Sequence, residues 1–109
     1  MSHQIAPQPN GLSLAGRVDY SNAGACQREG QAILAALSAD GAWTCELSAL
    51  ETGSSVTAAV LMAWQRFAIS RNSTLSLTQA PERLVSILAA SNLDKVFAVE
   101  RTVEGNVTL

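Results

Sequence analysis

The sequence predicts an α/β fold, a sandwich built on a mostly parallel sheet of about four to five strands with about three to four helices. The main observation is that short segments with an apolar residue at every second position alternate with segments of helical periodicity. Strands separated by helices of about 10–15 residues require crossover connections, which make neighbouring strands parallel. The length of 109 residues suits one domain with a hydrophobic core.

The chain begins with a polar segment that carries two prolines. We therefore expect residues 1–10 to form a flexible N-terminal tail and residues 11–109 to form a single domain. In residues 11–19, Leu12 and Leu14 share one face of a period-2 pattern, which indicates a half-buried strand. The aspartate that ends this segment is expected to support the turn after the strand.

A helix is expected next, in residues 23–41, with Ser21 or Asn22 as its N-cap. It should stop near Gly41, because glycine commonly follows the last helical turn. Residues 42–50 have the Trp, Thr, Cys and Leu content of a short strand.

The second half of the chain repeats this alternation. The strongly apolar residues 55–71 predict a second helix, and residues 74–79 alternate as a strand. Pro81 opens a third helix, with Glu82 near its positive end. Residues 95–99 predict a last short strand.

The composition excludes some partners and favours others. The net charge is −2 and the seven basic residues are spread along the chain, so no basic stripe exists to bind nucleic acid or an anionic membrane surface. No segment approaches the roughly 20 apolar residues that span a bilayer, so no direct membrane insertion is expected. Charged residues make up only 15% of the chain and hydrophobic residues 48%, which predicts uncovered apolar surface and hence a protein interface.

Residues 51–55, with the sequence ETGSS, place one acid, one glycine and three hydroxyl groups where a strand gives way to a helix. The hydroxyl of Thr52 or Ser54 could cap that helix, and Gly53 would give the turn its backbone freedom. An anion cradle is disfavoured, because the cluster has no Lys or Arg and Glu51 would repel an anion.

Catalysis and metal binding have little support. A nucleophilic hydroxyl needs a base, and the only histidine, His3, lies in the expected tail. The acids, cysteines and histidine lack metal-ligand spacing, and no glycine-rich nucleotide motif is present. Cys26 and Cys45 are expected to be buried, inert thiols. We therefore predict a protein that is not an enzyme and uses no cofactor or metal.

The helix after this cluster has two apolar sides when it is laid out at about 100° per residue. The expected core face carries Val56, Val60, Ala63, Trp64 and Phe67. Ala58, Met62 and Ile69 gather around Gln65 on the other side, where a solvated helix normally carries charge. Either the fold itself buries this helix on more than one side, or the second side is an interface. We favour the interface, with the hydroxyls of the ETGSS cluster at its leading edge.

Three sequence patterns occur in order along roughly residues 11–100: LSLAGRVD, CELSALETGSS and LSLTQAPERLVSILAASNLDKVFAV. They look like an early strand with Gly and Asp, a strand leading into a helix start, and a closing strand-helix-strand. In this order they resemble the STAS domain family, named after sulfate transporters and anti-sigma-factor antagonists. The LETGSS segment is most similar to the MlaB-like branch, which carries Thr-Gly at this point.

The resemblance implies a function, because MlaB-like proteins are cytoplasmic accessory subunits of the Mla phospholipid ABC transporter, which maintains outer-membrane lipid asymmetry. It implies a non-catalytic, cytoplasmic chain that is peripheral to the inner membrane through its partner. That partner would be the ATPase subunit of the membrane complex, which the chain would stabilise or activate. No small-molecule substrate and no nucleic acid is expected. The expected partner-binding residues are Glu51, Thr52, Gly53, Ser54, Ser55, Ala58, Met62 and Gln65.

Within this set, Thr52 matches the Thr that the lipid-transport branch places at its ATPase contact. Glu51 replaces the usual Asp and Ser54 the usual Gly of the family. An alternative from another class is a phosphorylation-switched antagonist of an anti-sigma factor, with Thr52, Ser54 and Ser55 as possible phosphoacceptors. Gly53 occupies the position of the phosphorylated Ser in the sigma-regulating branch, which weighs against that alternative.

Overall fold

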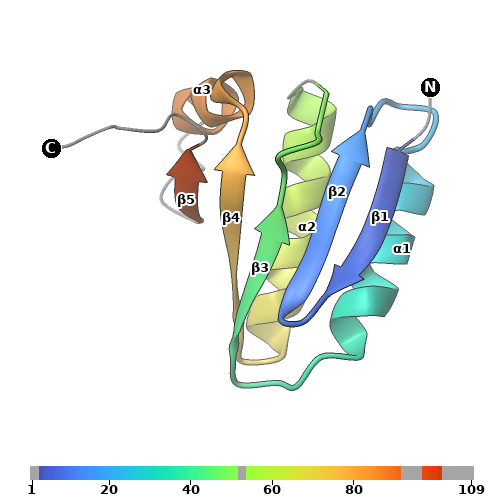
Figure 1. The fold of residues 1–109 in the computed structure, drawn as a ribbon, viewed down its shortest axis with the longest axis vertical. Coiled ribbons are helices and arrows are strands. Elements are labelled where there is room, and N and C mark those ends of the chain that lie inside the picture. The colour runs from blue at the N-terminus through green and yellow to red at the C-terminus, as the bar shows by residue number, and fades with distance from the viewer. Residues whose placement is uncertain (1–2, 52–53, 92–96, 102–109) are drawn as a thin grey trace, which may run out of the picture.

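The computed structural model describes residues 3–51, 54–91 and 97–101, with only the backbone for 98–101. In this part the elements are β1 (His3–Gln8), β2 (Gly11–Gly16), α1 (Ala23–Ala35), β3 (Ala42–Glu46), α2 (Ser55–Ser70), β4 (Thr74–Ala80), α3 (Glu82–Ala90) and β5 (Ala98–Arg101). One five-stranded sheet has the order β1-β2-β3-β4-β5, with β2 to β5 parallel and β1 antiparallel to β2 (Figure 1). The predicted α/β class with a mostly parallel sheet is confirmed.

The first strand corrects the expectation of a flexible N-terminal tail. His3–Gln8 pairs with β2 through a two-residue turn at Pro9 and Asn10, so the prediction is wrong for these residues. The prolines that suggested a tail are compatible with a strand at the edge of a sheet. Pro7 has no N–H to donate, and an edge strand leaves alternate N–H groups without a ladder partner in any case.

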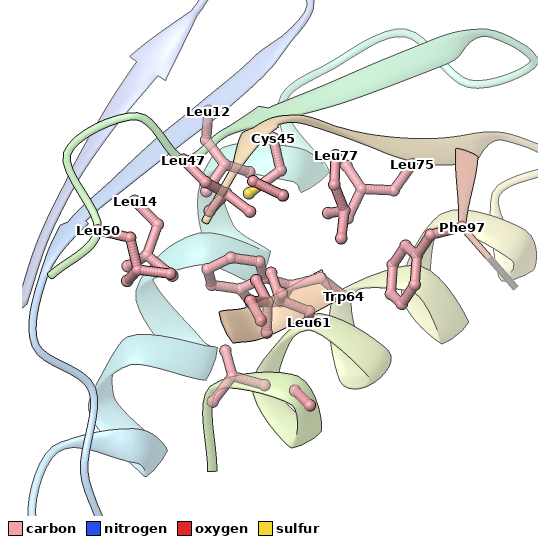
Figure 2. Packing of buried hydrophobic residues seen from close by; sticks show 14 of the residues in the cluster. Leu12, Leu14, Cys45, Leu47, Leu50, Leu61, Trp64, Leu75, Leu77 and Phe97 are labelled. Atoms are coloured by element: carbon pink, nitrogen blue, oxygen red, sulfur yellow. The ribbon is translucent and has the colours of Figure 1, made fainter. Parts of the chain in front are cut away.

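The alternation of the strands divides the sheet into a buried and an open face. Leucine side chains of β2 and β4 are fully or almost fully buried, and Figure 2 shows Leu12 and Leu77 directed toward Leu61 and Trp64 of α2. The intervening positions, such as Ser13 and Thr44, are only partly buried. In Figure 1, α1 and α2 lie side by side behind the sheet, so the core lies between these helices and the leucine-bearing face.

The predicted helix of residues 23–41 ends earlier than expected, at Ala35. The chain tightens there, because the N–H groups of Ala36 and Leu37 each donate to the carbonyl three residues back. The Trp43 indole then donates to the Ser38 carbonyl at 3.1 Å, which fixes the connection to β3. Gly41, the expected stop signal, therefore belongs to this connection. No helix in the described ranges is long and apolar enough to cross a membrane.

The two helices behind the sheet meet at a glycine. The Trp64 side chain of α2 is fully buried, and its Nε1 donates to the Gln27 carbonyl of α1 at 3.0 Å. The indole ring occupies the space beside Gly30, where a Cβ would overlap its atoms. Gly30 is therefore needed to let α1 approach α2 closely.

Gly30→Ala is expected to lower the free energy of unfolding by about 1–3 kcal/mol, because the new methyl group must displace a fully buried indole. The measurement is urea denaturation followed by tryptophan fluorescence. Gly24→Ala in the same helix is the matched control, since its Cβ would meet only the end of the Arg28 side chain at 3.4 Å. The control is expected to leave stability unchanged or slightly higher. Equal effects of the two substitutions would contradict this account of the helix contact.

Candidate partner-binding site

The connection from β3 toward α2 is held at the carboxyl edge of the sheet. Gly16 adopts a φ of 82°, and its N–H donates to the Ala49 carbonyl at 3.0 Å while its own carbonyl accepts from Glu51 N–H at 2.8 Å. On the side of β4, the N–H of Leu47 donates to the Thr78 carbonyl at 2.9 Å. The connection is thus fixed between β2 and β4, so Glu51 has a defined position. Its carboxylate lies 3.7 Å from Arg17, an exposed pair of small energetic weight.

Ser54 is the N-cap of α2, which confirms one of the two predicted caps. Its φ and ψ are −145° and 170°, and its Oγ accepts a hydrogen bond from Thr57 N–H at 3.2 Å. The Thr57 hydroxyl, which is buried, lies 3.2 Å from the same oxygen. The Ser54 hydroxyl is therefore committed to the helix start, whereas Ser55 is exposed. Thr52 and Gly53 lie outside the described residues.

Ala58 and Gln65 do not belong to the surface to which the sequence assigned them. Ala58 is 4% exposed and Gln65 is 2% exposed, so the prediction that they face outward is wrong. The reason is that α2 lies in the middle of the helical layer, in contact with α1, α3 and β4, and is buried on more than one side. Met62 is half-buried and packs against the core.

The face of α2 that does reach solvent is a narrow stripe at helical spacing. It consists of Ser55, Ala59, the half-buried Met62, Arg66, Ile69 and the last helical residue, Ser70. Ile69 is 59% exposed, one of two large hydrophobic side chains found exposed in the described ranges. Of the predicted partner-binding residues, Glu51, Ser54, Ser55 and Met62 therefore keep an exposed or partly exposed position.

Gln65 instead completes the edge of β4. Its Nε2 donates to the Leu75 carbonyl at 2.9 Å, and its Oε1 accepts from Leu75 N–H at 2.9 Å. Among the described residues, the pairing of β5 with β4 begins at Ser76, and at Leu75 the side-chain amide supplies the two hydrogen bonds that a neighbouring strand would otherwise make. A glutamine can do this because its amide presents one donor and one acceptor side by side.

A groove that the sequence did not predict lies between the first turns of α1 and α2. It has a volume of about 320 Å³, and its lining includes Ala23, Gly24, Val56 and Ala59. Tyr20 borders the groove and is 88% exposed. An exposed tyrosine beside an apolar groove is typical of protein interfaces. The only sign of this site in the sequence was an aromatic residue in the turn before a helix. The groove itself forms only where α1 and α2 pack together.

The turn that carries Tyr20 is rigidly bonded. The Asp19 carboxylate accepts from Ser21 Oγ at 2.6 Å, from Ser21 N–H at 2.9 Å and from Asn22 N–H at 3.2 Å, so the predicted support of this turn is confirmed. These bonds, that from the Ser21 hydroxyl first, lower the pKa of Asp19 against the opposing effect of desolvation. Asn22 is the N-cap residue of α1, but its side chain makes no capping bond there; its amide donates to the Arg17 carbonyl at 2.9 Å instead.

The histidine and the two cysteines lie outside the groove and in settings that do not favour catalysis. His3 Nε2 lies 2.9 Å from Glu29 Oε1, so this histidine joins β1 to α1. Cys26 and Cys45 are buried free thiols, and burial raises the pKa of Cys26 to about 12 and raises that of Cys45 further, which makes both poor nucleophiles. In the described part of the chain, no group of three potential ligand side chains is placed to hold a metal ion.

Gln65→Leu is expected to lower the free energy of unfolding by about 2–4 kcal/mol, because the N–H and C=O of Leu75 would lose their partners in a buried position. Chemical denaturation measures the change. Arg66→Leu, which introduces the same side chain at the next, exposed position, should shift stability by no more than about 0.5 kcal/mol. A neutral Gln65→Leu would show that the two bonds contribute little.

Ser54→Ala is expected to lower the free energy of unfolding by about 1 kcal/mol through loss of the N-cap bond to Thr57. The neighbouring Ser55→Ala is the control, because Ser55 is exposed and does not occupy the cap position. Thermal and urea denaturation of both variants test this assignment, which would be wrong if the two lost equal stability.

Comparison with known proteins agrees with this architecture. The family model described as "Mlab, STAS domain" matches residues 1–101, and none of the curated proteins matches the chain. STAS domains are generally non-catalytic, and the family supports an accessory or regulatory function exercised through protein–protein contacts. Because the family model spans nearly the whole of the fold described above, from β1 to β5, the chain belongs to the STAS domain family and stands close to MlaB.

Proposed function

We propose that this protein is a non-catalytic accessory subunit that binds the ATPase of an ABC-type phospholipid transporter and stabilises or activates it. The observation that carries the proposal is the surface at the start of α2, where the exposed Ser55 and Tyr20 border an apolar groove. The MlaB description of the matching family model directs the choice of partner. The protein would act from the cytoplasmic side of the inner membrane, held there by its partner.

The chemistry of this surface suits a protein better than a small ligand. The groove is open, its lining is mostly small and apolar, and the capping hydroxyl of Ser54 is already used within the helix. Glu51 is partnered by Arg17 at the edge of the same region. A partner that covers the groove would remove apolar surface from water without stranding a buried charge. If this protein bound one conformation of the ATPase better than another, its binding would shift the ATPase toward that conformation.

The test is binding of the purified protein to the purified ATPase subunit of the phospholipid transporter from the same organism, measured by calorimetry. Thr52→Arg and Ser55→Arg are each expected to weaken the complex at least about tenfold, equivalent to roughly 1.4 kcal/mol, because a long cation would enter the contact. Ser38→Arg, an exposed serine beyond the far end of α1, should bind like the wild type. Absence of a wild-type complex, or equal affinity of all three variants, would contradict the proposal.

A phosphorylation-switched antagonist of an anti-sigma factor is the second candidate, favoured by one observation. The Ser55 hydroxyl is exposed at the first residue of α2, where a phosphate would meet the positive end of the helix. Phosphate would bring about −1.5 to −2 charges to the docking surface and would oppose contact with an apolar partner. Intact-mass measurement of the protein isolated from stressed cells tests this, and persistent absence of a phosphoryl adduct counts against the switch.

A further inference from the structure

The seam between α1 and α2 contains two hollows on its outer side. The first is the groove beside Tyr20. The second has a volume of about 360 Å³ and is lined by residues that include Gln31, Phe67 and Arg71. Gln27 borders both hollows, so they follow one another along the seam and form a single path, called here the α1–α2 seam.

Small side chains make this seam concave. Gly24, Ala32 and Ala35 line it from α1, and Ala59 lines it from α2. The close approach of the helices at Gly30 fixes its width. From Ala59 to the end of α2 the seam extends roughly 17 Å, at about 1.5 Å per helical residue, which is the length of about three turns of a second helix.

The charges along the seam have one sign. Arg28 and Arg71 line the second hollow, and Arg66 lies on the exposed stripe of α2 next to it. No carboxylate in the described ranges forms an ion pair with any of the three. The one acidic residue of α1, Glu29, is bonded to His3 of β1 instead. The charged side chains at the seam are therefore all basic, with Arg28 reaching back toward the first turn of α1 and Arg66 and Arg71 lying toward the end of α2.

Two of these arginines are positioned by contacts with neighbouring residues of the seam. The Arg28 guanidinium lies close to Gly24, within 3.4 Å of the place a Cβ would occupy, so it extends along α1 at the border of the groove. The Arg71 guanidinium lies over the Phe67 ring, 5.5 Å from its centroid. This cation–π contact and a 3.5 Å hydrogen bond to the Ala35 carbonyl orient the group, and no carboxylate of the described residues pairs with its charge.

We propose that the α1–α2 seam binds an amphipathic helix of the ATPase subunit whose apolar side chains enter the groove beside Tyr20 and whose carboxylates meet Arg28, Arg66 and Arg71. This inference rests on the proposed function, and it specifies which part of the partner is recognised. Charge complementarity carries it: Arg28 and Arg71 line the path, Arg66 lies beside it, and none of the three has an ion-pair partner among the described residues, so burying them requires acidic partner groups. A helix in a groove is a common mode of such recognition.

The other occupants fit less well. An anionic membrane surface is usually bound by clusters of about 4–8 basic residues, more than the three found along the seam, and a flat bilayer would not fill a concave path. A second copy of the chain offers no acidic helix among the described elements, since α3 has a single acidic residue, Glu82, and a basic one, Arg83.

The first experiment measures the affinity of the ATPase subunit for the double variant Arg28→Glu/Arg66→Glu at low and high salt. Both residues are exposed, so the variant should fold, and its thermal unfolding checks this. We expect a loss of affinity of at least about tenfold and a smaller salt dependence than the wild type. Arg83→Glu on α3 is the matched control and should bind normally. Gly24→Leu, which fills the apolar groove without changing charge, should also weaken binding at least about threefold.

The second experiment places a photo-crosslinking amino acid at Gln31, on the wall of the second hollow. Crosslinks to a helical, acidic segment of the ATPase would support the proposal, and crosslinks confined to loops or basic segments would overturn it. If Arg28→Glu/Arg66→Glu and Gly24→Leu bind as tightly as the wild type while Ser55→Arg does not, the docking function stands and the seam proposal falls. If the wild type forms no complex, the proposed function itself fails.

Two further outcomes would also overturn the proposal. In the first, the wild type sediments with phosphatidylglycerol vesicles, Arg28→Glu/Arg66→Glu does not, and both bind the ATPase equally well. That result would assign the arginines to a lipid surface. In the second, the wild type dimerises as its concentration rises, the same variant does not, and the affinity for the ATPase is again unchanged. That result would assign the seam to a second copy of the chain.

Discussion

The contact between the Trp64 ring and Gly30 determines the spacing of the helical layer, and the rest of the structure depends on that spacing. The indole fills the core beneath α1 and donates its N–H to a backbone carbonyl of that helix, so a large buried side chain keeps its polar atom satisfied. With α1 and α2 held close, the sheet face bearing the leucines is covered, and the seam outside the contact becomes concave. The candidate docking surface is thus the outer side of a core contact.

The candidate site lies where these helices begin, at the carboxyl edge of the parallel strands. Gly16 holds the end of β2 to the connection that leads toward α2, and the Ser54 hydroxyl supplies the missing partner for the first helical turn. These interactions leave Ser55 and Tyr20 exposed beside the groove. Structural and binding roles are therefore divided among adjacent residues, which is why substitutions at neighbouring serines can separate them.

The low charge of α2 has two causes that the sequence pattern does not distinguish. Part of it reflects burial, because α1, α3 and β4 all contact this helix and Ala58 and Gln65 face into the fold. The other part reflects the narrow exposed stripe of α2, in which Arg66 is the only charged side chain. Hydrophobic periodicity reports which residues avoid water, but it does not report whether the same chain or another one covers them.

The sequence by itself determined the class of fold, the order of the elements from β2 onward and the support of the turn at Asp19, and it narrowed the cap of α2 to Thr52 or Ser54. These features depend on residues close together in the chain, so periodicity, capping and turn chemistry are sufficient to predict them. Only the tertiary structure decided that β1 is a strand, that Gln65 completes β4, and that Tyr20 and Arg28 border one seam with α2. Each of these depends on residues distant in the sequence, and their proximity is fixed by packing of the whole domain rather than by any local pattern.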